Sequence, residues 1–103
     1  MWNFRLFAYY FYLAPEIIKR DCHDLNVDLW CLGILTFEFL TGKPPFEHKS
    51  HLQTKNNILS SDYDDSMLSL RAKEFVRGLL RRNPKERTPL SNCIKKEFIL
   101  YHN

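Results

Sequence analysis

Cysteine and histidine side chains are the first candidates for chemistry in this 103-residue chain, because thiolate and imidazole groups bind metals and act as nucleophiles or bases. The three cysteines, Cys22, Cys31 and Cys93, include no pair at C-x-x-C spacing, and the histidines at positions 23, 48 and 51 complete no zinc pattern. Cys22 precedes His23, but adjacent side chains diverge and no third group orients them. We therefore expect no metal site, no catalytic thiol and reduced cysteines.

Glycine and basic residues could instead bind phosphate. The only three glycines, Gly33, Gly42 and Gly78, lie inside or just after expected helices, which leaves no phosphate-binding loop. A basic cluster near the C-terminal end could be a phosphate or nucleic-acid patch; its members are Arg81, Arg82, Lys85 and Arg87. Four nearby charges without a basic stripe are more typical of a solvated face, and the net charge is only +3. We expect no nucleic-acid partner.

Asp28 is a carboxylate in an otherwise apolar segment. From Val27 to Leu40 the only polar residues are Asp28, Thr36 and Glu38, which do not gather on one face of a helix. We therefore expect this helix to be buried all round. An ionised carboxylate is tolerated there only with hydrogen-bond donors around it, unless Asp28 turns to solvent near the helix start, where the macrodipole favours it.

The elements that must position these residues are helices. Pro15 suits the first turn of a short helix through Arg20, and Gly42 followed by Pro44-Pro45 ends the apolar helix. That helix is too short and too interrupted to cross a membrane, which takes roughly 20 apolar residues. We expect no membrane partner.

The C-terminal half also reads as helical. A weak helix fits residues 50–59, and Ser69 is an expected N-cap for an amphipathic helix with a basic outer face. Thr88 is expected to cap a last helix, whose inner face would be lined by Leu90, Cys93, Ile94 and Phe98. The sum is an all-α fold, with four to five helices around a buried central helix at about residues 25–41. Residues 1–11, rich in aromatics and without a period, form a separate segment.

Four motifs follow one another at spacings that resemble the C-terminal half of the large lobe of eukaryotic protein kinases over residues 12–99. They are Tyr12-Leu13-Ala14-Pro15-Glu16, the segment Val27–Gly33, Gly42-Lys43-Pro44-Pro45-Phe46 and Asn83-Pro84-Lys85-Glu86-Arg87. The stretch from His23 through Glu47 is most similar to the Aurora serine/threonine kinases, and polo-like kinases are the nearer competitor. The resemblance predicts a partial kinase lobe at residues 12–100.

The resemblance assigns roles to particular residues. Ala14, Pro15 and Glu16 match the end of the activation segment, and Glu16 is expected to pair with Arg87 through the two parallel hydrogen bonds that a guanidinium offers a carboxylate. Two solvated charges are the alternative. Asp28 matches the aspartate that anchors the catalytic loop. Glu38 matches a contact to a substrate arginine upstream of the phosphoacceptor, with a merely solvated carboxylate as the alternative.

Packing roles follow as well. We expect four apolar residues of the central helix, Trp30, Leu32, Leu35 and Phe39, in the core. Gly33 is expected to let another helix approach closely.

Parts that the family needs for phosphoryl transfer are absent from these 103 residues: the Gly-rich loop, the strand lysine, the HRD-type loop and the DFG aspartate. ATP and Mg²⁺ belong to the full-length family, and neither is expected to bind this chain. Where the family carries Gly-Thr, this sequence has Ala8-Tyr9, and residues 1–11 look unlike the family, as if a truncated gene model or an aberrant exon replaced the upstream sequence.

Three hypotheses remain open. The first is a catalytically inactive part of an Aurora-like kinase that acts on protein serine or threonine, in the cytoplasm, the nucleus or at the spindle. The second is a non-catalytic interaction module that uses residues 47–60 and Glu38 to bind a substrate or a regulatory protein. The third is a fragment without function, in which the helix at 27–40 lacks its natural packing partner, the upstream kinase segments.

Overall fold

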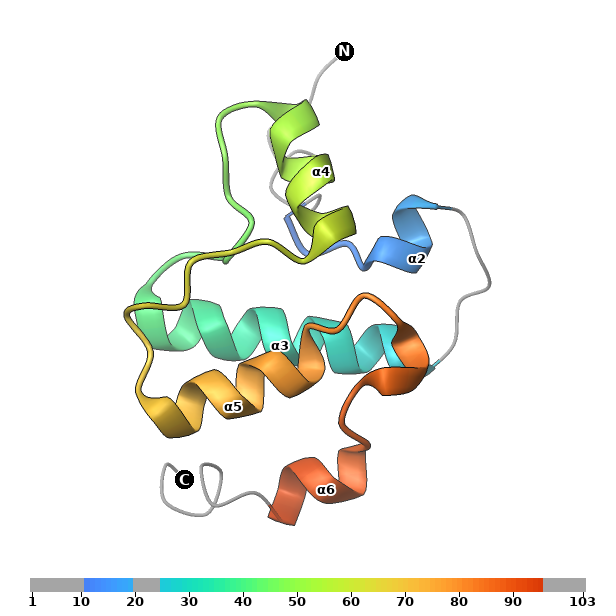
Figure 1. Cartoon of the computed structure of the whole chain (residues 1–103), viewed down its shortest axis with the longest axis vertical. Helices are drawn as coiled ribbons and strands as arrows, with labels where there is room; N and C mark the ends of the chain where they lie inside the picture. Colours follow the sequence, from blue (N-terminus) through green and yellow to red (C-terminus); the bar gives the residue numbers. More distant parts are fainter. Residues whose placement is uncertain (1–10, 20–24, 96–103) are drawn as a thin grey trace.

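The computed structural model describes residues 11–19 and 25–95, with only the backbone for the last two of these. The predictions on residues 1–10, Arg20, Cys22, His23, the side chain of Ile94 and Phe98 lie outside the described residues. Every regular element in the described ranges is helical, which confirms the all-α prediction (Figure 1). The elements are α2 (Pro15–Ile18), α3 (Leu25–Thr41), α4 (His51–Ser60), α5 (Leu70–Leu79), the 3₁₀ turn η1 (Pro84–Glu86) and α6 (Leu90–Lys95).

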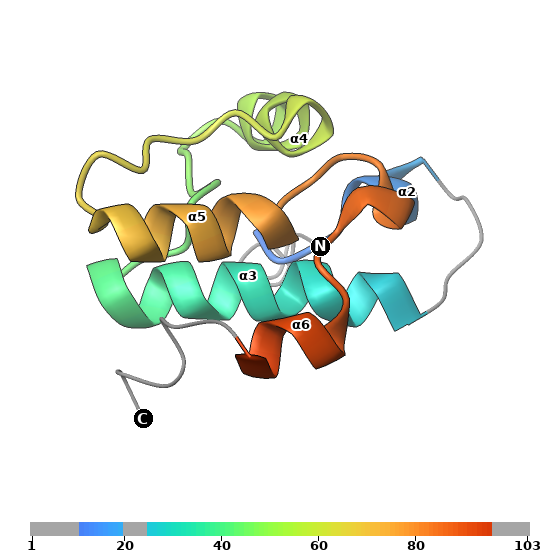
Figure 2. The same ribbon diagram turned by 60° about the horizontal axis from the view of Figure 1, so that its bottom comes forward.

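Helix α3 ends where the sequence predicts. The Gly42 N–H donates to the Glu38 carbonyl at 2.8 Å, and Gly42 has φ +93°, a conformation that glycine adopts without steric cost. Helix α5 lies alongside α3 in both views (Figures 1 and 2). Gly33 permits this contact, because a Cβ there would lie 2.9 Å from both Leu79 Cβ and Leu80 Cδ2. The expected close packing at Gly33 is thus confirmed.

The sequence predicts the cap of one helix, α5, correctly, and it predicts the start of α6 one residue too early. The Ser69 hydroxyl accepts a hydrogen bond from the Ala72 N–H at 3.2 Å, as predicted. Thr88, in contrast, does not begin the last helix. The Pro89 carbonyl accepts from the N–H groups of Asn92 and Cys93, so α6 starts one residue later, at Leu90. Leu90 is 52% exposed, which corrects its expected place on the inner face, while Cys93 is buried.

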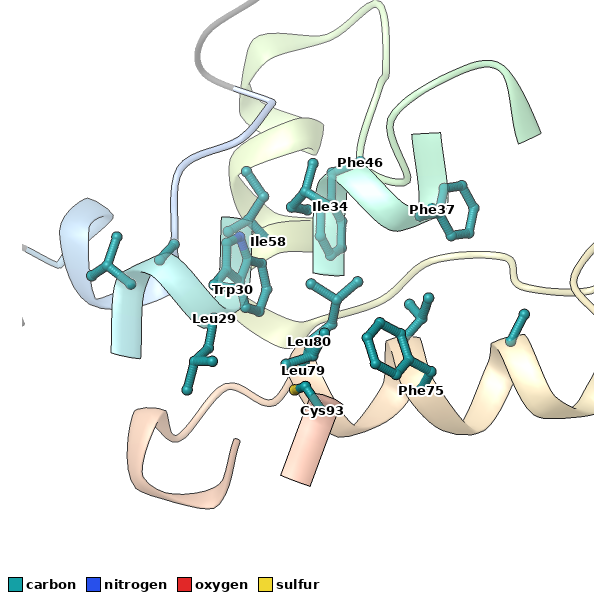
Figure 3. Packing of buried hydrophobic residues seen from close by; sticks show 14 of the residues in the cluster. Leu29, Trp30, Ile34, Phe37, Phe46, Ile58, Phe75, Leu79, Leu80 and Cys93 are labelled. Carbon is teal, nitrogen blue, oxygen red and sulfur yellow. The ribbon is translucent and has the colours of Figure 1, made fainter. Parts of the chain in front are cut away.

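The core gathers between α3, α4, α5 and the chain that follows Gly42. Trp30 is completely buried and stacks on Phe46, with ring centroids 5.5 Å apart and an interplanar angle of 6° (Figure 3). Tyr63 packs edge-on against Phe46 and Phe37, at 5.6 and 5.9 Å. Ile58 brings α4 into the same cluster. The segment after α3 therefore folds back to cover the tryptophan.

Helix α3 is not buried all round, contrary to the prediction. Phe39 is 88% exposed, Leu35 is 55% exposed, and Asp28 also faces solvent, while Leu32 is half-buried. These positions follow one stripe of the helix, since they are spaced by three, four or seven residues. The described elements cover the opposite side of α3. An apolar residue shows that a position suits burial, but the covering partner has to come from elsewhere in the chain or from another chain.

Candidate functional site

The first part of the candidate site is an ion pair between Glu16 in the first turn of α2 and Arg87 just after η1. Arg87 Nη1 lies 2.7 Å from Glu16 Oε2, and Nη2 lies 2.8 Å from Oε1. The Arg87 side chain is fully buried, and that of Glu16 is 5% exposed. This is the two-pronged geometry in which a guanidinium binds a carboxylate most strongly. It joins two residues 71 positions apart in the sequence.

Arg87 makes three further contacts. Its Nε donates to the Arg81 carbonyl at 2.9 Å, and Nη1 also donates to the Asn26 carbonyl at 2.8 Å. The guanidinium carbon lies 5.1 Å from the centre of the Trp30 ring, within range of a cation–π interaction. One side chain thus ties α2, the start of α3 and the loop before η1 to the tryptophan core.

Ala14 and Pro15 set the position of Glu16. Both are almost fully buried, and the Ala14 carbonyl accepts hydrogen bonds from the N–H groups of Ile17 and Ile18 at 3.0 and 3.2 Å. Pro15 occupies the first turn of α2, where its missing N–H costs no hydrogen bond. The helix is a single turn ending at Ile18, shorter than the expected end at Arg20. The three residues therefore form one buried corner rather than an exposed loop.

Glu38, on the C-terminal part of α3, is the second part of the site. Its Oε1 accepts a hydrogen bond from the Tyr12 hydroxyl at 2.5 Å. Burial and then the Glu38 carboxylate raise the pKa of Tyr12 to about 12. The pairing of Tyr12 with Glu38 is not predicted from the sequence. A phenol directly before the Leu-Ala-Pro-Glu run was the available signal, but the aromatic start offers no period that would orient it.

The comparisons with known proteins bear on this arrangement. The family model described as protein kinase domain matches residues 6–99. The chain belongs to the protein kinase family. Over 95 residues it is 42% identical to an Aurora kinase of Encephalitozoon cuniculi (strain GB-M1), which covers 89% of this chain and 35% of that protein.

Two further kinases are similar. Aurora kinase B of Xenopus tropicalis is 42% identical over 89 residues, covering 85% of this chain and 25% of that kinase. Serine/threonine-protein kinase PLK4 of Nematostella vectensis is 37% identical over 89 residues, covering 85% of this chain and 9% of that kinase. The predicted resemblance to Aurora kinases, with polo-like kinases as the competitor, is therefore confirmed. This chain spans about a third or less of the length of the curated kinases it matches.

Asp28 lies in a different environment from the buried Glu16–Arg87 pair. It is exposed near the start of α3, and none of the hydrogen bonds formed by the described residues reaches its carboxylate. Of the two predictions for this residue, the structure of the described residues agrees with the one in which Asp28 faces solvent. The donors that a catalytic-loop anchor needs are not supplied by residues 11–19 or 25–95.

The described residues do not fit ATP and Mg²⁺. Gly33 and Gly78 lie within helices against Leu79 and Thr88, and Gly42 ends α3, so none forms a phosphate loop. Within those ranges no three histidine, cysteine or acidic side chains gather as a metal would require. Burial raises the pKa of the Cys31 thiol, which disfavours the reactive thiolate. No helix in the described ranges is long and apolar enough to cross a membrane.

The raised pKa values of Tyr12 and Tyr63 predict a loss of folding stability at high pH. Burial raises the pKa of Tyr12 and of Tyr63 to about 12, with added contributions from Glu38 and Asp65 respectively, whereas an unfolded tyrosine titrates near 10. Because the folded chain holds these protons more tightly, the stabilisation is complete below about pH 10 and is lost as the pH rises from about 10 through 12.

Urea unfolding at a series of pH values checks this expectation. Lysines titrate in the same window, so the comparison is with a Tyr12→Phe, Tyr63→Phe double variant. The double variant should show the flatter decline of unfolding free energy above about pH 10. Equal slopes for the two chains would contradict the prediction.

Proposed function

We propose that this chain is the C-terminal part of the catalytic domain of an Aurora-like protein serine/threonine kinase. In it, Arg87 holds the end of the activation segment, residues 14–16, and Glu38 serves as the acidic contact for a basic substrate residue. The observation that carries the proposal is the buried two-pronged Glu16–Arg87 pair. The pair fixes α2 against α3 and so sets where the activation segment ends relative to Glu38.

The exposed stripe of α3 supports the same proposal. The stripe holds the Asp28 carboxylate, which forms no hydrogen bond with the described residues. It also holds two large apolar side chains exposed to solvent, those of Leu35 and Phe39. A stripe of this kind marks a packing surface. In the proposed kinase domain, upstream kinase segments pack on it, and Asp28 accepts hydrogen bonds from backbone N–H groups of the catalytic loop.

These 103 residues by themselves transfer no phosphoryl group under this proposal. The sequence holds neither the base aspartate nor the Mg²⁺-binding residues that phosphoryl transfer in this family requires. ATP and Mg²⁺ would bind in other parts of the kinase domain. The partners of the whole domain are then a protein substrate or a regulatory protein, in the cytoplasm or nucleus, with the spindle as the site that the Aurora likeness favours.

A chimeric kinase tests the proposal. Residues 12–99 replace the matching segment of the Aurora kinase B catalytic domain of Xenopus tropicalis, a kinase that is 42% identical to this chain over 89 residues. We expect the chimera to transfer labelled phosphate from ATP to serine or threonine of a basic protein substrate, and the isolated 103-residue chain to transfer none. A Glu38→Ala chimera should lose the preference for peptides with an upstream arginine.

The matched control is a chimera with Glu47→Ala, an exposed carboxylate beyond the end of α3. Its peptide preference should stay unchanged. A chimera that folds cooperatively but transfers no phosphate would contradict the proposed function. Transfer by the isolated chain would contradict the proposal that these residues alone are inactive.

A further inference from the structure

A polar groove of about 1120 Å³ lies away from Glu38, between α2, the end of α4 and the segment from α5 to η1. Both views place α2 and η1 next to each other at one side of the molecule (Figures 1 and 2). The groove exceeds the roughly 300–1,000 Å³ of small-molecule pockets and is wide open, so its dimensions suit a chain segment better than a compact ligand.

The charge of this groove is unbalanced. Four of its lining residues are exposed cations that pair with no carboxylate among the described residues: Lys19, Arg81, Arg82 and Lys85. Two lining carboxylates are already occupied, Glu16 by Arg87 and Asp65 by Arg77 at 2.7 Å. Glu86 is the one lining carboxylate left without a cation in the described ranges. An occupant would therefore meet excess positive charge.

We propose that the groove binds an extended anionic segment of a partner protein, whose carboxylates or phosphates pair with Arg81, Arg82 and Lys85. Arginines that flank one groove recognise such groups by forked hydrogen bonds and recur in the binding of acidic and phosphorylated motifs. The cations line one groove instead of a long stripe, and the chain's net charge is only +3, which favours a peptide over a nucleic acid. Such binding is separate from phosphoryl transfer and needs no kinase activity.

Binding should also stabilise the fold. Lys19 follows α2 and Lys85 lies in η1, so a bound segment that contacts both would bridge the elements that Glu16 and Arg87 already join. A ligand that binds only the folded chain raises the melting temperature by mass action. Affinity and melting temperature should therefore rise together as acidic peptide is added.

Fluorescence anisotropy of labelled peptides against the full 103-residue chain tests the proposal. One peptide carries glutamates, a second carries phosphoserines at the same positions, and a third carries uncharged glutamines. We expect the two anionic peptides to bind and the neutral one to fail. Arg81→Glu with Arg82→Glu should weaken binding at least about ten-fold, since each reversal turns an attraction into a repulsion. Raising the salt concentration should weaken the wild-type complex.

The matched control reverses Lys49 and Lys55 to glutamate, two exposed lysines outside the groove, with the same change in net charge. Circular dichroism confirms that both double variants are folded, which is expected because all four side chains are exposed. Equal affinities of the two variants would overturn the proposal, because general charge would then explain binding. It would also be overturned if the anionic peptides failed to bind, or if single-stranded RNA displaced them at lower concentration.

Discussion

Arg87→Ala is expected to remove about 3–5 kcal/mol from the free energy of unfolding, because it leaves the Glu16 carboxylate buried without its partner. Small domains are stable by about 5–15 kcal/mol, so the loss is a large part of the stability of a chain of this size. The substitution also removes the hydrogen bonds that Arg87 donates to the carbonyls of Asn26 and Arg81, and it removes the cation over the Trp30 ring.

Urea unfolding followed by circular dichroism and tryptophan fluorescence measures this loss. We expect coincident, cooperative transitions for the wild type and a transition at much lower urea for Arg87→Ala. Glu16→Ala should be destabilised similarly, since it strands the guanidinium. The matched control is Arg82→Ala, an exposed arginine nearby, whose effect should stay within about 0.5 kcal/mol.

The double variant separates the pair from its surroundings. Because Glu16→Ala with Arg87→Ala strands neither charge, its cost should be well below the sum of the two single costs. Additive costs would show that the two side chains act independently, against the ion pair. An Arg87→Ala chain as stable as the wild type would show that the fork contributes nothing to folding.

Local features of this fold could be predicted from short stretches of sequence. Ser69 before an apolar repeat, and Gly42 before two prolines, indicate helix ends by backbone chemistry that needs no distant partner. Gly33 in an apolar helix indicated close approach of a second helix, and Leu79 and Leu80 supply that contact. In these cases the physical cause lies in the residue itself and in its immediate sequence neighbours.

The periodicity of apolar residues alone could not predict contacts between residues that are distant in the sequence. The pairing of Glu16 with Arg87 was expected only through the resemblance to kinases, since nothing local links positions 71 apart. The Tyr12–Glu38 bond was missed because Tyr12 belongs to an aromatic stretch without a period. The sequence predicts a solvated face for the cluster of Arg81, Arg82, Lys85 and Arg87, whereas Arg87 is buried and Lys19 joins the other three only once α2 packs beside η1.

The predicted burial of Leu35 and Phe39 was wrong for one physical reason. Hydrophobic pattern reports the preference of a side chain for an apolar neighbour, and it does not supply the neighbour. In the described residues α5 and the segment after Gly42 cover only one side of α3. The exposed stripe therefore agrees with a chain that spans about a third or less of the length of these curated relatives.

Trp30→Ala is expected to cost about 3–5 kcal/mol, as removal of a fully buried large aromatic side chain does. Trp30 is completely buried, stacks on Phe46 and supports the Arg87 guanidinium, so its loss would open a cavity at the junction of core and site. Circular dichroism during urea unfolding measures the cost without depending on the indole. Met67→Ala, at a residue that is 76% exposed, is the matched control and should change little.

Trp30→Phe distinguishes packing from hydrogen bonding at this position. The indole N–H is buried and has no hydrogen-bond partner among the described residues, so a phenyl ring loses no bond there and keeps the stack on Phe46. We expect Trp30→Phe to retain much of the stability that Trp30→Ala loses. Equal damage from both would contradict the packing account. Combining Trp30→Ala with Arg87→Ala should cost less than the two losses added together, because the aromatic face and the guanidinium stabilise one another in a single contact.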